Sequence, residues 1–583
     1  MRFLSEIKIP RLYIFLIAVV ILYSVFVRLQ GLGYSNFQGD EVNPMDFMYE
    51  MNNGVFSYLL DQKRGSIQYL INMANVGIFG YHNEFQIRFP FFVFGSLAIL
   101  TLYKLSKKIF NSTSAFFTAV LVAVNGLFIA FARITQYQSV IYFLIPVGVL
   151  LFINAIDKND NKKLAVSGLI MSLALLAHYD TLSVAPFFIV VFASRYFRDF
   201  IEISRGKSRL LKELAKKLLI FWGAFLIPAL VYYIPFYFHT AFSDTTSVYL
   251  GNRLLGGGLM PRTEITKMLL SMYIPQFFIY LLFALGFAAL FFEWKKTGEF
   301  ITKKLVWIVK NLHLQYLYAA AVLLIPAVSI FSLYPIKPRL SSVTVILLSI
   351  FITFVLAASK KVDKYLAGLA GWFLGSYSFY FFIMKDPRTH VYVVFIPLFI
   401  LAGYGFFRLY SAISAVKLRN VLLILFSVVL LYISGLNWVI FVDKSPEYPW
   451  WDKDYLGQPI YRIGRARHKK IEGVFGFNSY RAWDQLADLY KRGCITGDFN
   501  SNEKDSITYF YVRQHQKQGG QWGLFADSDN LAIAESPHSW EYDVIKDQYP
   551  GYKLLDTIKS NGYTVLRVFG RENLYPEGKL LCN

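Results

Sequence analysis

Cysteine is scarce in this sequence of 583 residues, and acidic side chains are outnumbered by basic ones. Neither Cys494 nor Cys582 belongs to a metal-ligand spacing. The two could pair if their part of the chain lies outside the cytoplasm, and the sequence leaves this open. No internal repeat is visible, and the first apolar run lacks a small-x-small cleavage site. We therefore expect that run to be a retained helix rather than a signal peptide.

The imbalance of charge gives a formal net charge of +21, with 59 Lys and Arg against 38 Asp and Glu. From Val442 to the end of the chain, however, the two signs balance at about 19 residues each. The basic excess therefore lies in short loops between apolar runs, as the positive-inside rule requires of a membrane protein. It does not form the basic surface of a nucleic-acid-binding protein, so no nucleic-acid partner is expected.

Apolar residues are abundant, at 55% of the chain with 18% aromatic residues and a mean hydropathy of +0.42. Repeated apolar runs predict a polytopic all-α membrane protein of the cytoplasmic membrane, with about 13 transmembrane helices. Arg2, Lys8 and Arg11 precede the first run. These residues and the basic loops predict a cytoplasmic N-terminus and place the loop after the first span outside.

The composition changes after Val442, where charged and turn residues return. We therefore predict a transmembrane domain over residues 1–441 and a small extracytoplasmic α/β domain over 442–583. The outer loop 30–87 is expected to hold two helices on the membrane surface, Asn43–Asp61 and Ile67–Phe79. In the outer domain the pattern predicts a helix over Arg481–Arg492 and strands over Val474–Phe477, Ser506–Val512 and Thr564–Val568.

Two adjacent carboxylates, Asp40 and Glu41, stand in the polar loop after the first span. Acidic residues at a membrane span are costly and usually serve function. They could equally cap a following helix, where a carboxylate satisfies free amides and the helix dipole. The dipeptide alone does not decide between these readings.

Several basic residues fall in segments predicted to lie outside, where the positive-inside rule disfavours them. An anionic ligand at the membrane boundary, such as a lipid phosphate, would account for the set, although any one of them could simply snorkel. They are Arg88, Arg133, Lys337, Arg339, Lys385 and Arg388. On the same side, His178, Asp180, Gln136 and Gln138 could bind a sugar or a neighbouring helix.

Three short motifs resemble the GT-C glycosyltransferases: Gly39-Asp40-Glu41, Arg88-Phe89-Pro90 and Ala132-Arg133. A later segment, Arg388-Thr389-His390-Val391-Tyr392 followed by Pro397, resembles the branch of protein O-mannosyltransferases and aminoarabinose transferases. The resemblance covers roughly Leu12 to Phe407 and leaves the C-terminal domain unassigned. It implies a GT-C-like helical bundle with its active site on the outer side and a sugar donor carried on a polyprenyl phosphate.

The resemblance also implies roles for individual residues. Asp40 matches the acid that activates the acceptor, with Glu41 as its companion. Arg88, Arg133 and Arg388 match positions near the donor phosphate, and Lys337 and Arg339 extend that basic set. We expect His178, Asp180, Gln138 and His390 to bind substrate. Many relatives have an acid at the position of Gln138, and an amide is a poorer metal ligand. A need for a divalent cation is therefore left open, with Asp40 as the ligand if one binds.

Together these observations predict an inverting glycosyltransferase that uses a dolichyl- or undecaprenyl-type phosphate donor. The acceptor would be a protein, a lipid or an envelope glycan outside the cytoplasm, and neither acceptor nor sugar is identified. One carboxylate near the acceptor and a basic clamp on the leaving phosphate suffice for this chemistry. The alternatives are a transporter or flippase of a lipid-linked sugar, which would favour repeats and broken helices, and a non-catalytic receptor or scaffold.

Overall fold

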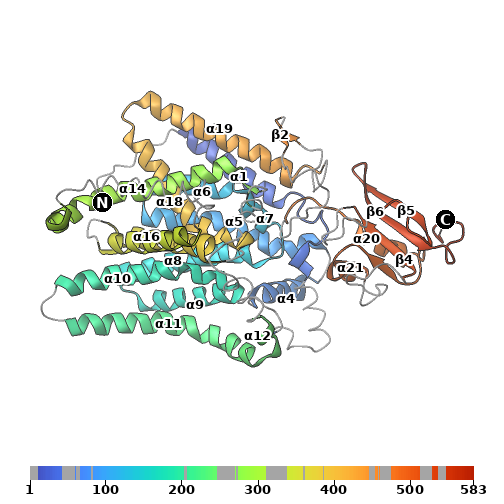
Figure 1. Ribbon diagram of the computed structural model, residues 1–583, viewed down its shortest axis with the longest axis horizontal. Helices are drawn as coiled ribbons and strands as arrows, with labels where there is room; N and C mark the ends of the chain where they lie inside the picture. Colours follow the sequence, from blue (N-terminus) through green and yellow to red (C-terminus); the bar gives the residue numbers. More distant parts are fainter. Residues whose placement is uncertain are drawn as a thin grey trace.

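The computed structural model describes residues 11–42, 60, 66–80, 83–202, 207–245, 270, 273–309, 338–358, 362–384, 387–444, 454–456, 458–459, 475–512, 528–535 and 546–582. A bundle of long helices runs along the longest axis of the molecule (Figure 1). A small domain that contains a β-sheet covers one end of this bundle, on the right in Figure 1.

A helix lies over each predicted span except the ninth, which falls outside the described residues. The helices of the bundle are α1 (Arg11–Leu29), α5 (Glu84–Ile109), α6 (Ser112–Ala123), α7 (Gly126–Ala132), α8 (Tyr137–Lys158), α9 (Asn161–Ala177), α10 (Ala185–Glu202), α11 (Lys207–Phe238), α14 (Gln276–Val309), α16 (Pro338–Ala358), α17 (Lys364–Ser378), α18 (Tyr392–Ala412) and α19 (Val416–Phe441). The short α12 (Thr240–Thr245) follows α11.

Within the described part of the chain, seven helices are long and apolar enough to cross a membrane, or eight if the bent pair α6 and α7 counts as one span. Large apolar side chains are exposed on the outer helices; Val231 and Phe238 of α11 are examples. Such faces suit contact with lipid rather than water. The helix α18 is instead buried along its whole span, so it forms the centre of the bundle. The number of about 13 spans stays a prediction.

The third predicted span, Ala115–Phe131, is not one straight helix. Helix α6 ends at Ala123 and α7 begins at Gly126, with an angle of 66° between them. The side chain of Asn125 caps α7 by accepting a hydrogen bond from the Phe128 amide at 3.2 Å. A Cβ at Gly126 would meet the Tyr273 carbonyl oxygen at 2.0 Å, so this junction requires glycine. The apolar sequence hides the break because both halves are hydrophobic.

The end of the bundle beside the C-terminal domain is named the outer end after the predicted sidedness, and the opposite end the inner end (Figure 1). At the inner end, Asp157 of α8 pairs with Lys108 of α5 at 2.8 Å and with Lys364 of α17 at 3.6 Å. At the outer end lie the 3-10 helix η1 (Gly39–Val42) and the surface helix α4 (Ile67–Phe79). A helix over Ile67–Phe79 is confirmed and its place on the membrane surface stays a prediction, whereas the predicted helix Asn43–Asp61 lies outside the described residues. Which end faces the cytoplasm stays a prediction.

The C-terminal domain contains a four-stranded sheet in the order β3-β4-β6-β5. Strand β3 (Phe499–Ser501) is parallel to β4 (Asn530–Ala534), and β6 (Tyr563–Arg571) is antiparallel to both β4 and β5 (Tyr552–Ser560). The helices α20 (Trp483–Lys491) and α21 (Asp505–Val512) pack together beside it. A separate two-stranded hairpin joins β1 (Asp454–Tyr455) to β2 (Gln458–Pro459).

Two local predictions in this domain are confirmed and two are wrong. Thr564–Val568 lies within β6, and Arg481–Arg492 contains α20. The predicted strand Ser506–Val512 is instead the helix α21. The described part of Val474–Phe477 is irregular, because its backbone bonds to the loop after α1 rather than to a neighbouring strand.

Candidate active site

Asp40 lies on η1 at the outer end of the bundle. The preceding Gly39 adopts a φ of 54°, a left-handed conformation that favours glycine. The Asp40 side chain is 38% exposed, and its Oδ1 atom lies 3.8 Å from Nζ of Lys504 in the C-terminal domain. Lys504 also donates a hydrogen bond to the Gly39 carbonyl at 3.5 Å. Asp40 is therefore an accessible carboxylate with a cation supplied by the distant C-terminal domain.

Glu41 is surrounded differently, because its carboxylate is completely buried. It accepts hydrogen bonds from Nε and Nη2 of Arg88 at 2.9 and 2.8 Å. The amides of Thr135 and Gln38 donate to the same carboxylate at 2.9 and 2.8 Å. These contacts join three segments of the chain, so Glu41 positions the loop that carries Asp40.

Arg88, in the first turns of α5, has a guanidinium with five N–H groups. Two of them donate to Glu41, and the others reach the carbonyl oxygens of Leu32, Ser35 and Asn36 at 2.9, 2.9 and 3.2 Å. The side chain is thus fully engaged in shaping the loop. Direct contact with a donor phosphate, as the sequence suggested, stays a prediction and would require Arg88 to exchange one of these partners.

Arg133 follows α7 and is also buried. It donates to the carbonyl oxygens of Val27 and Gln30 at 2.6 and 2.7 Å, at the C-terminal end of α1. Its Nε donates to the Gly476 carbonyl in the C-terminal domain at 2.9 Å. A cation at this place satisfies the free carbonyls of the helix end and opposes the helix dipole. Arg133 therefore joins α1, α7 and the C-terminal domain, and its phosphate role is untested.

His178, Asp180 and His390 come together as a buried cluster from separate parts of the chain. His178 ends α9, Asp180 lies on the 3-10 helix η2 (Tyr179–Val184), and His390 lies on η5 (Arg388–Val391) before α18. Oδ2 of Asp180 lies 3.1 Å from Nδ1 of His178 and 2.8 Å from Nδ1 of His390. Tyr380, in the π-helical turn η4 (Phe379–Ile383), donates from its hydroxyl to Oδ1 of Asp180 at 2.8 Å.

The neighbours of Asp180 act on its pKa in opposite directions. Burial alone would raise its pKa, but the adjacent His178 and His390 outweigh burial and hold the pKa of Asp180 well below its usual range. The cluster therefore combines one buried negative charge with two imidazoles. Buried titratable groups that specific partners perturb in this way mark a candidate functional site.

The segment Thr135–Gln138 connects this cluster to the loop of Asp40. The Thr135 amide donates to Glu41, and two residues later the Tyr137 ring stacks on His178 with centroids 4.1 Å apart. Gln138 follows at the start of α8, buried, and its Oε1 makes no hydrogen bond within the described part of the chain. The predicted catalytic loop and the predicted substrate-binding residues thus form one continuous region.

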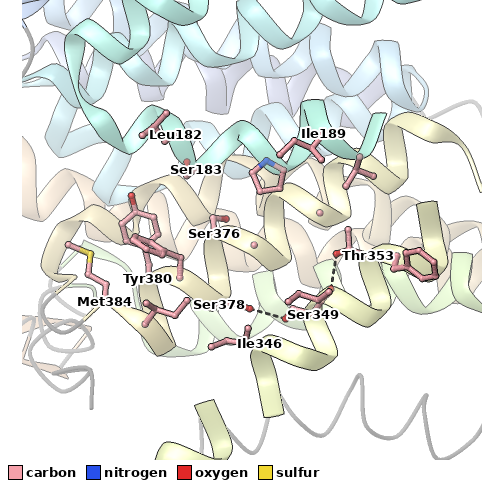
Figure 2. Close-up of a pocket in the computed structure, with 18 of the residues that line it drawn as sticks. Leu182, Ser183, Ile189, Ile346, Ser349, Thr353, Ser376, Ser378, Tyr380 and Met384 are labelled. Carbon is pink, nitrogen blue, oxygen red and sulfur yellow. Dashed lines mark hydrogen bonds between the residues drawn. The ribbon is translucent and has the colours of Figure 1, made fainter. Parts of the chain in front are cut away.

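An elongated cavity of about 830 Å³ leads away from the cluster between α10, α16 and α17. Figure 2 shows Tyr380 and Met384 at one end and Thr353 toward the other. Asp180 and Tyr179 line the cavity with Tyr380, while most of the remaining wall is apolar. Ile189 and Phe354, which line it, are also 60% and 62% exposed. The cavity therefore opens on the face of the bundle that suits lipid, and it ends at a charged group.

The structure describes less of the remaining predicted site residues. Arg388 lies two residues before His390, is partly exposed and has a φ of 43°. Lys337 lies outside the described residues. Arg339 is the second residue of α16, and its side chain is not among those described. None of these three is tested as a phosphate ligand.

The sequence did not reveal Lys504, Tyr380 or the docking of the C-terminal domain on the loop. Arg481 of that domain forms a fully buried ion pair with Glu503 at 2.7 Å. Its amide donates to Oδ1 of Asn36 at 2.8 Å, and its Nη2 donates to the Phe37 carbonyl at 2.5 Å. More than 440 residues separate these partners. Sidedness was the one available signal, since both segments were predicted to lie outside.

Residues 67–206 match the family model described as dolichyl-phosphate-mannose-protein mannosyltransferase. The matched part contains Arg88, Arg133, Gln138, His178 and Asp180. The predicted resemblance to the protein O-mannosyltransferases is thereby confirmed over this segment. No curated protein matches the sequence.

Several solved structures are similar to this chain. The S. cerevisiae protein O-mannosyltransferase Pmt1-Pmt2 complex bound to the sugar donor has 17% identity and a TM-score of 0.33, covering 42% of this chain and 36% of that one. The Archaeoglobus fulgidus oligosaccharyltransferase in complex with Zn and sulfate has 13% identity and a TM-score of 0.42, covering 88% and 58%. ArnT from Cupriavidus metallidurans bound to undecaprenyl phosphate has 11% identity and a TM-score of 0.49, covering 96% and 98%. This chain thus spans less than two thirds of the first two.

Proposed function

We propose that this protein is a membrane glycosyltransferase that moves a sugar from a polyprenyl-phosphate donor to an acceptor outside the cytoplasm, with inversion at the sugar carbon. The observation that carries the proposal is the match of residues 67–206 to the dolichyl-phosphate-mannose-protein mannosyltransferase family. That segment contributes the arginine that orders the Asp40 loop and the acid at the end of the cavity. The sugar and the acceptor are not specified by it.

Asp40 is the carboxylate best placed to act as the general base. Glu41 is buried and accepts four hydrogen bonds, so it has no oxygen left for a substrate. Asp40 is partly exposed on the same rigid turn, and Lys504 lies beside it. A carboxylate that accepts the proton of an acceptor hydroxyl contributes about 10²–10⁴-fold to the rate. We assign Glu41 and Arg88 to positioning Asp40.

The cavity supports the proposed class of donor. Its apolar wall fits a polyprenyl chain, and its exposed rim would let that chain enter from the bilayer. Its volume of about 830 Å³ lies in the range of ligand pockets, about 300–1,000 Å³. The polar end at Asp180 would then receive the phosphate and sugar. The disulfide between Cys494 and Cys582 supports an outer placement of the C-terminal domain, because disulfides persist in oxidising compartments.

The proposal is tested by the substitution Asp40→Asn in the full-length protein. Purified protein in lipid nanodiscs would be incubated with a panel of dolichyl- and undecaprenyl-phosphate sugars and an envelope extract as the source of acceptor. We expect wild-type protein to release polyprenyl phosphate from at least one donor, as measured by mass spectrometry. Asp40→Asn should reduce this release about 100-fold or more, with the melting temperature unchanged.

The matched control is Asp488→Asn, which also neutralises an exposed carboxylate of the outer part that is paired with one cation, Arg492. This variant should keep the wild-type rate. A rate for Asp40→Asn within threefold of wild type would refute the role of Asp40. Absence of turnover by wild-type protein with every donor, together with unchanged envelope glycans in cells without the protein, would refute the proposed function.

A further inference from the structure

The cluster of His178, Asp180 and His390 has the composition of a transition-metal site. One ligand atom from each residue lies within 4.8 Å of the others, and all three residues are buried. Within the described residues, no other group of three His, Cys, Asp or Glu side chains meets this condition. The three residues come from two loops that are more than 200 positions apart, so the fold brings them together.

The distances are close to those that a bound ion would set. Metal bonds of about 2.0–2.2 Å in a tetrahedral site separate the ligand atoms by about 3.3–3.6 Å. The Asp180 Oδ2 atom lies 3.1 and 2.8 Å from the two imidazole Nδ1 atoms. The third separation, between the two imidazoles, is at most 4.8 Å, so small side-chain movements would open the cluster to a cation. Such movements are within the reach of side-chain rotation at a loop.

His178 would change its partner when an ion binds. Its Nδ1 accepts a hydrogen bond from the Asp180 amide at 3.2 Å. A metal ion on Nδ1 would take the same lone pair and replace this bond.

Neighbouring side chains already hold the three residues in place. Tyr380 occupies Oδ1 of Asp180 and leaves Oδ2 directed at the imidazoles. The His178 ring is stacked on Tyr137 on one side and lies against Tyr179, with centroids 4.1 and 3.9 Å apart. Hydrogen bonds and packing around the ligands are characteristic of metal sites, because they orient the ligand atoms before the ion binds.

We propose that His178, Asp180 and His390 bind a divalent transition metal ion such as Zn²⁺, with an open position directed at the end of the cavity. Two imidazoles and one carboxylate suit Zn²⁺, Co²⁺ or Mn²⁺ better than Mg²⁺ or Ca²⁺, which prefer oxygen ligands. Three protein ligands leave the fourth position of a tetrahedral ion for a further molecule. Asp40 is not part of this site, so the proposed ion is separate from the proposed general base.

The ion would also remove a repulsion between Asp180 and the donor phosphate. This part of the inference rests on the proposed function. The phosphate of a lipid lying in the cavity would come close to Asp180, which lines the cavity. Two negative groups repel each other strongly away from water. A divalent cation on Asp180 reverses the local charge, so its open position can bind a phosphate oxygen and stabilise the departing phosphate.

Metal binding can be measured without any activity. Full-length protein in nanodiscs would be stripped with EDTA, dialysed against Zn²⁺ or Co²⁺, and analysed by plasma mass spectrometry. We expect about one ion per chain for wild type and none above background for His390→Ala or Asp180→Asn. Four-coordinate Co²⁺ should also give intense visible absorption. Loss of the Tyr380 hydroxyl in Tyr380→Phe should weaken binding about 10–100-fold without abolishing it.

His239→Ala is the matched control. His239 lies at the outer end of α11, and its Nδ1 also accepts an amide two residues ahead, from Ala241 at 3.3 Å. It therefore shares the local hydrogen bond of His178, but among the described residues it belongs to no group of three possible metal ligands. This variant should bind one ion. Wild-type protein that binds no ion, or ion binding that survives in both His390→Ala and Asp180→Asn, would overturn the metal site.

The source of the phosphate is tested on the Co²⁺ protein. Undecaprenyl phosphate should change the Co²⁺ absorption at about 100-fold lower concentration than inorganic phosphate, because its chain also occupies the cavity. Equal responses to both, or none, would overturn the phosphate contact. These measurements need no sugar transfer, so the metal site can fail while the Asp40 test succeeds. The reverse result, an ion with no transfer from any donor and unchanged envelope glycans in cells without the protein, would refute the proposed function and leave the metal site standing.

Discussion

Asp40 and Glu41 are adjacent in the sequence but differ in what surrounds them. Glu41 is enclosed by Arg88 and two backbone amides, whereas Asp40 is partly exposed beside Lys504. A buried ion pair is costly to break, because one charge is left without a partner. At the scale of single residues, one carboxylate therefore maintains the shape of the loop and its neighbour remains available for chemistry.

The substitution Glu41→Gln should destabilise the protein. It removes the charge that compensates Arg88, which costs about 3–5 kcal/mol for a buried pair. We expect a lower melting temperature in nanodiscs, measured by the intrinsic fluorescence of the tryptophans, and a parallel loss of transfer. Asp40→Asn should lower activity without this change in melting temperature.

A second measurement separates positioning from direct catalysis by Glu41. If Glu41 touched the substrate, Glu41→Gln would lose activity and keep the wild-type melting temperature. Replacing both partners, as in Glu41→Leu with Arg88→Met, should recover part of the stability, since no buried charge is left unpaired. The recovery should be partial because Arg88 also satisfies three backbone carbonyls.

At the scale of helices and strands, long apolar runs were the reliable signal in the sequence. The pattern predicted the surface helix Ile67–Phe79 with its observed bounds. It could not predict the break at Asn125, because both flanking segments are apolar and the cause is a close contact with Tyr273. It also assigned Ser506–Val512 to a strand, since Ile, Thr, Tyr, Phe and Val favour strands locally. Packing of Phe510 on Phe37 is a tertiary contact that this local preference does not include.

The residues of the site were predicted better than their contacts. His178, Asp180 and His390 were all named from the sequence, and the structure joins them in one cluster. The outer arginines were also named. The sequence pattern of a basic residue at a membrane boundary does not distinguish one that binds a phosphate from one that caps a helix. Arg133 illustrates this, because its partners are carbonyls of α1 and of the C-terminal domain. Contacts between such distant positions leave no local pattern.

Narrowing the cavity should discriminate between donors by the length of their chains. Ala193 lines the cavity about 12 Å along α10 from the start of that helix. The substitution Ala193→Phe should fill the far end and raise the KM for a full-length polyprenyl-phosphate donor about tenfold. A tenfold rise in KM is the loss of binding expected when about two CH₂ groups of the polyprenyl chain no longer contact the apolar wall. A short-chain donor of two isoprene units should be used as by wild type.

The control for this experiment is Leu226→Phe on α11, which is exposed and does not line the cavity. It should leave the KM for both donors unchanged. An equal rise in KM for short and long donors with Ala193→Phe would mean that the chain lies elsewhere. The rates are to be measured by release of polyprenyl phosphate.

At the scale of the whole molecule, the C-terminal domain and the first outer loop form one folded unit. Phe37, Val42 and Ile87 lie in the same buried apolar cluster as Trp483 and Leu486. Gln38 both accepts from the Gly476 amide and donates to the Phe477 carbonyl, at 2.8 and 3.1 Å. The C-terminal domain therefore packs against the loop that carries Asp40 and holds that loop in place.

Removing the disulfide between Cys494 and Cys582 should destabilise the C-terminal domain and weaken its packing on the Asp40 loop. The bond closes a segment of 88 residues, and its loss typically costs about 2–5 kcal/mol. For Cys494→Ser we expect faster cleavage of the C-terminal domain by protease and a lower rate of transfer. Cys582→Ser should behave identically because it breaks the same bond. Unchanged cleavage in both variants would show that packing alone holds the domain.

The bond between Asn36 and Arg481 has a consequence for how the protein is made. The two residues are 445 positions apart, and ribosomes add about 5–20 residues per second. The first outer loop is therefore synthesised roughly 20–90 s before its partner. Throughout that interval a nascent chain has Asp40 but lacks Lys504 and the packing of the C-terminal domain on the loop. On the proposed function, sugar transfer would wait until synthesis has reached that domain, and chains truncated before it would lack these contacts to the Asp40 loop.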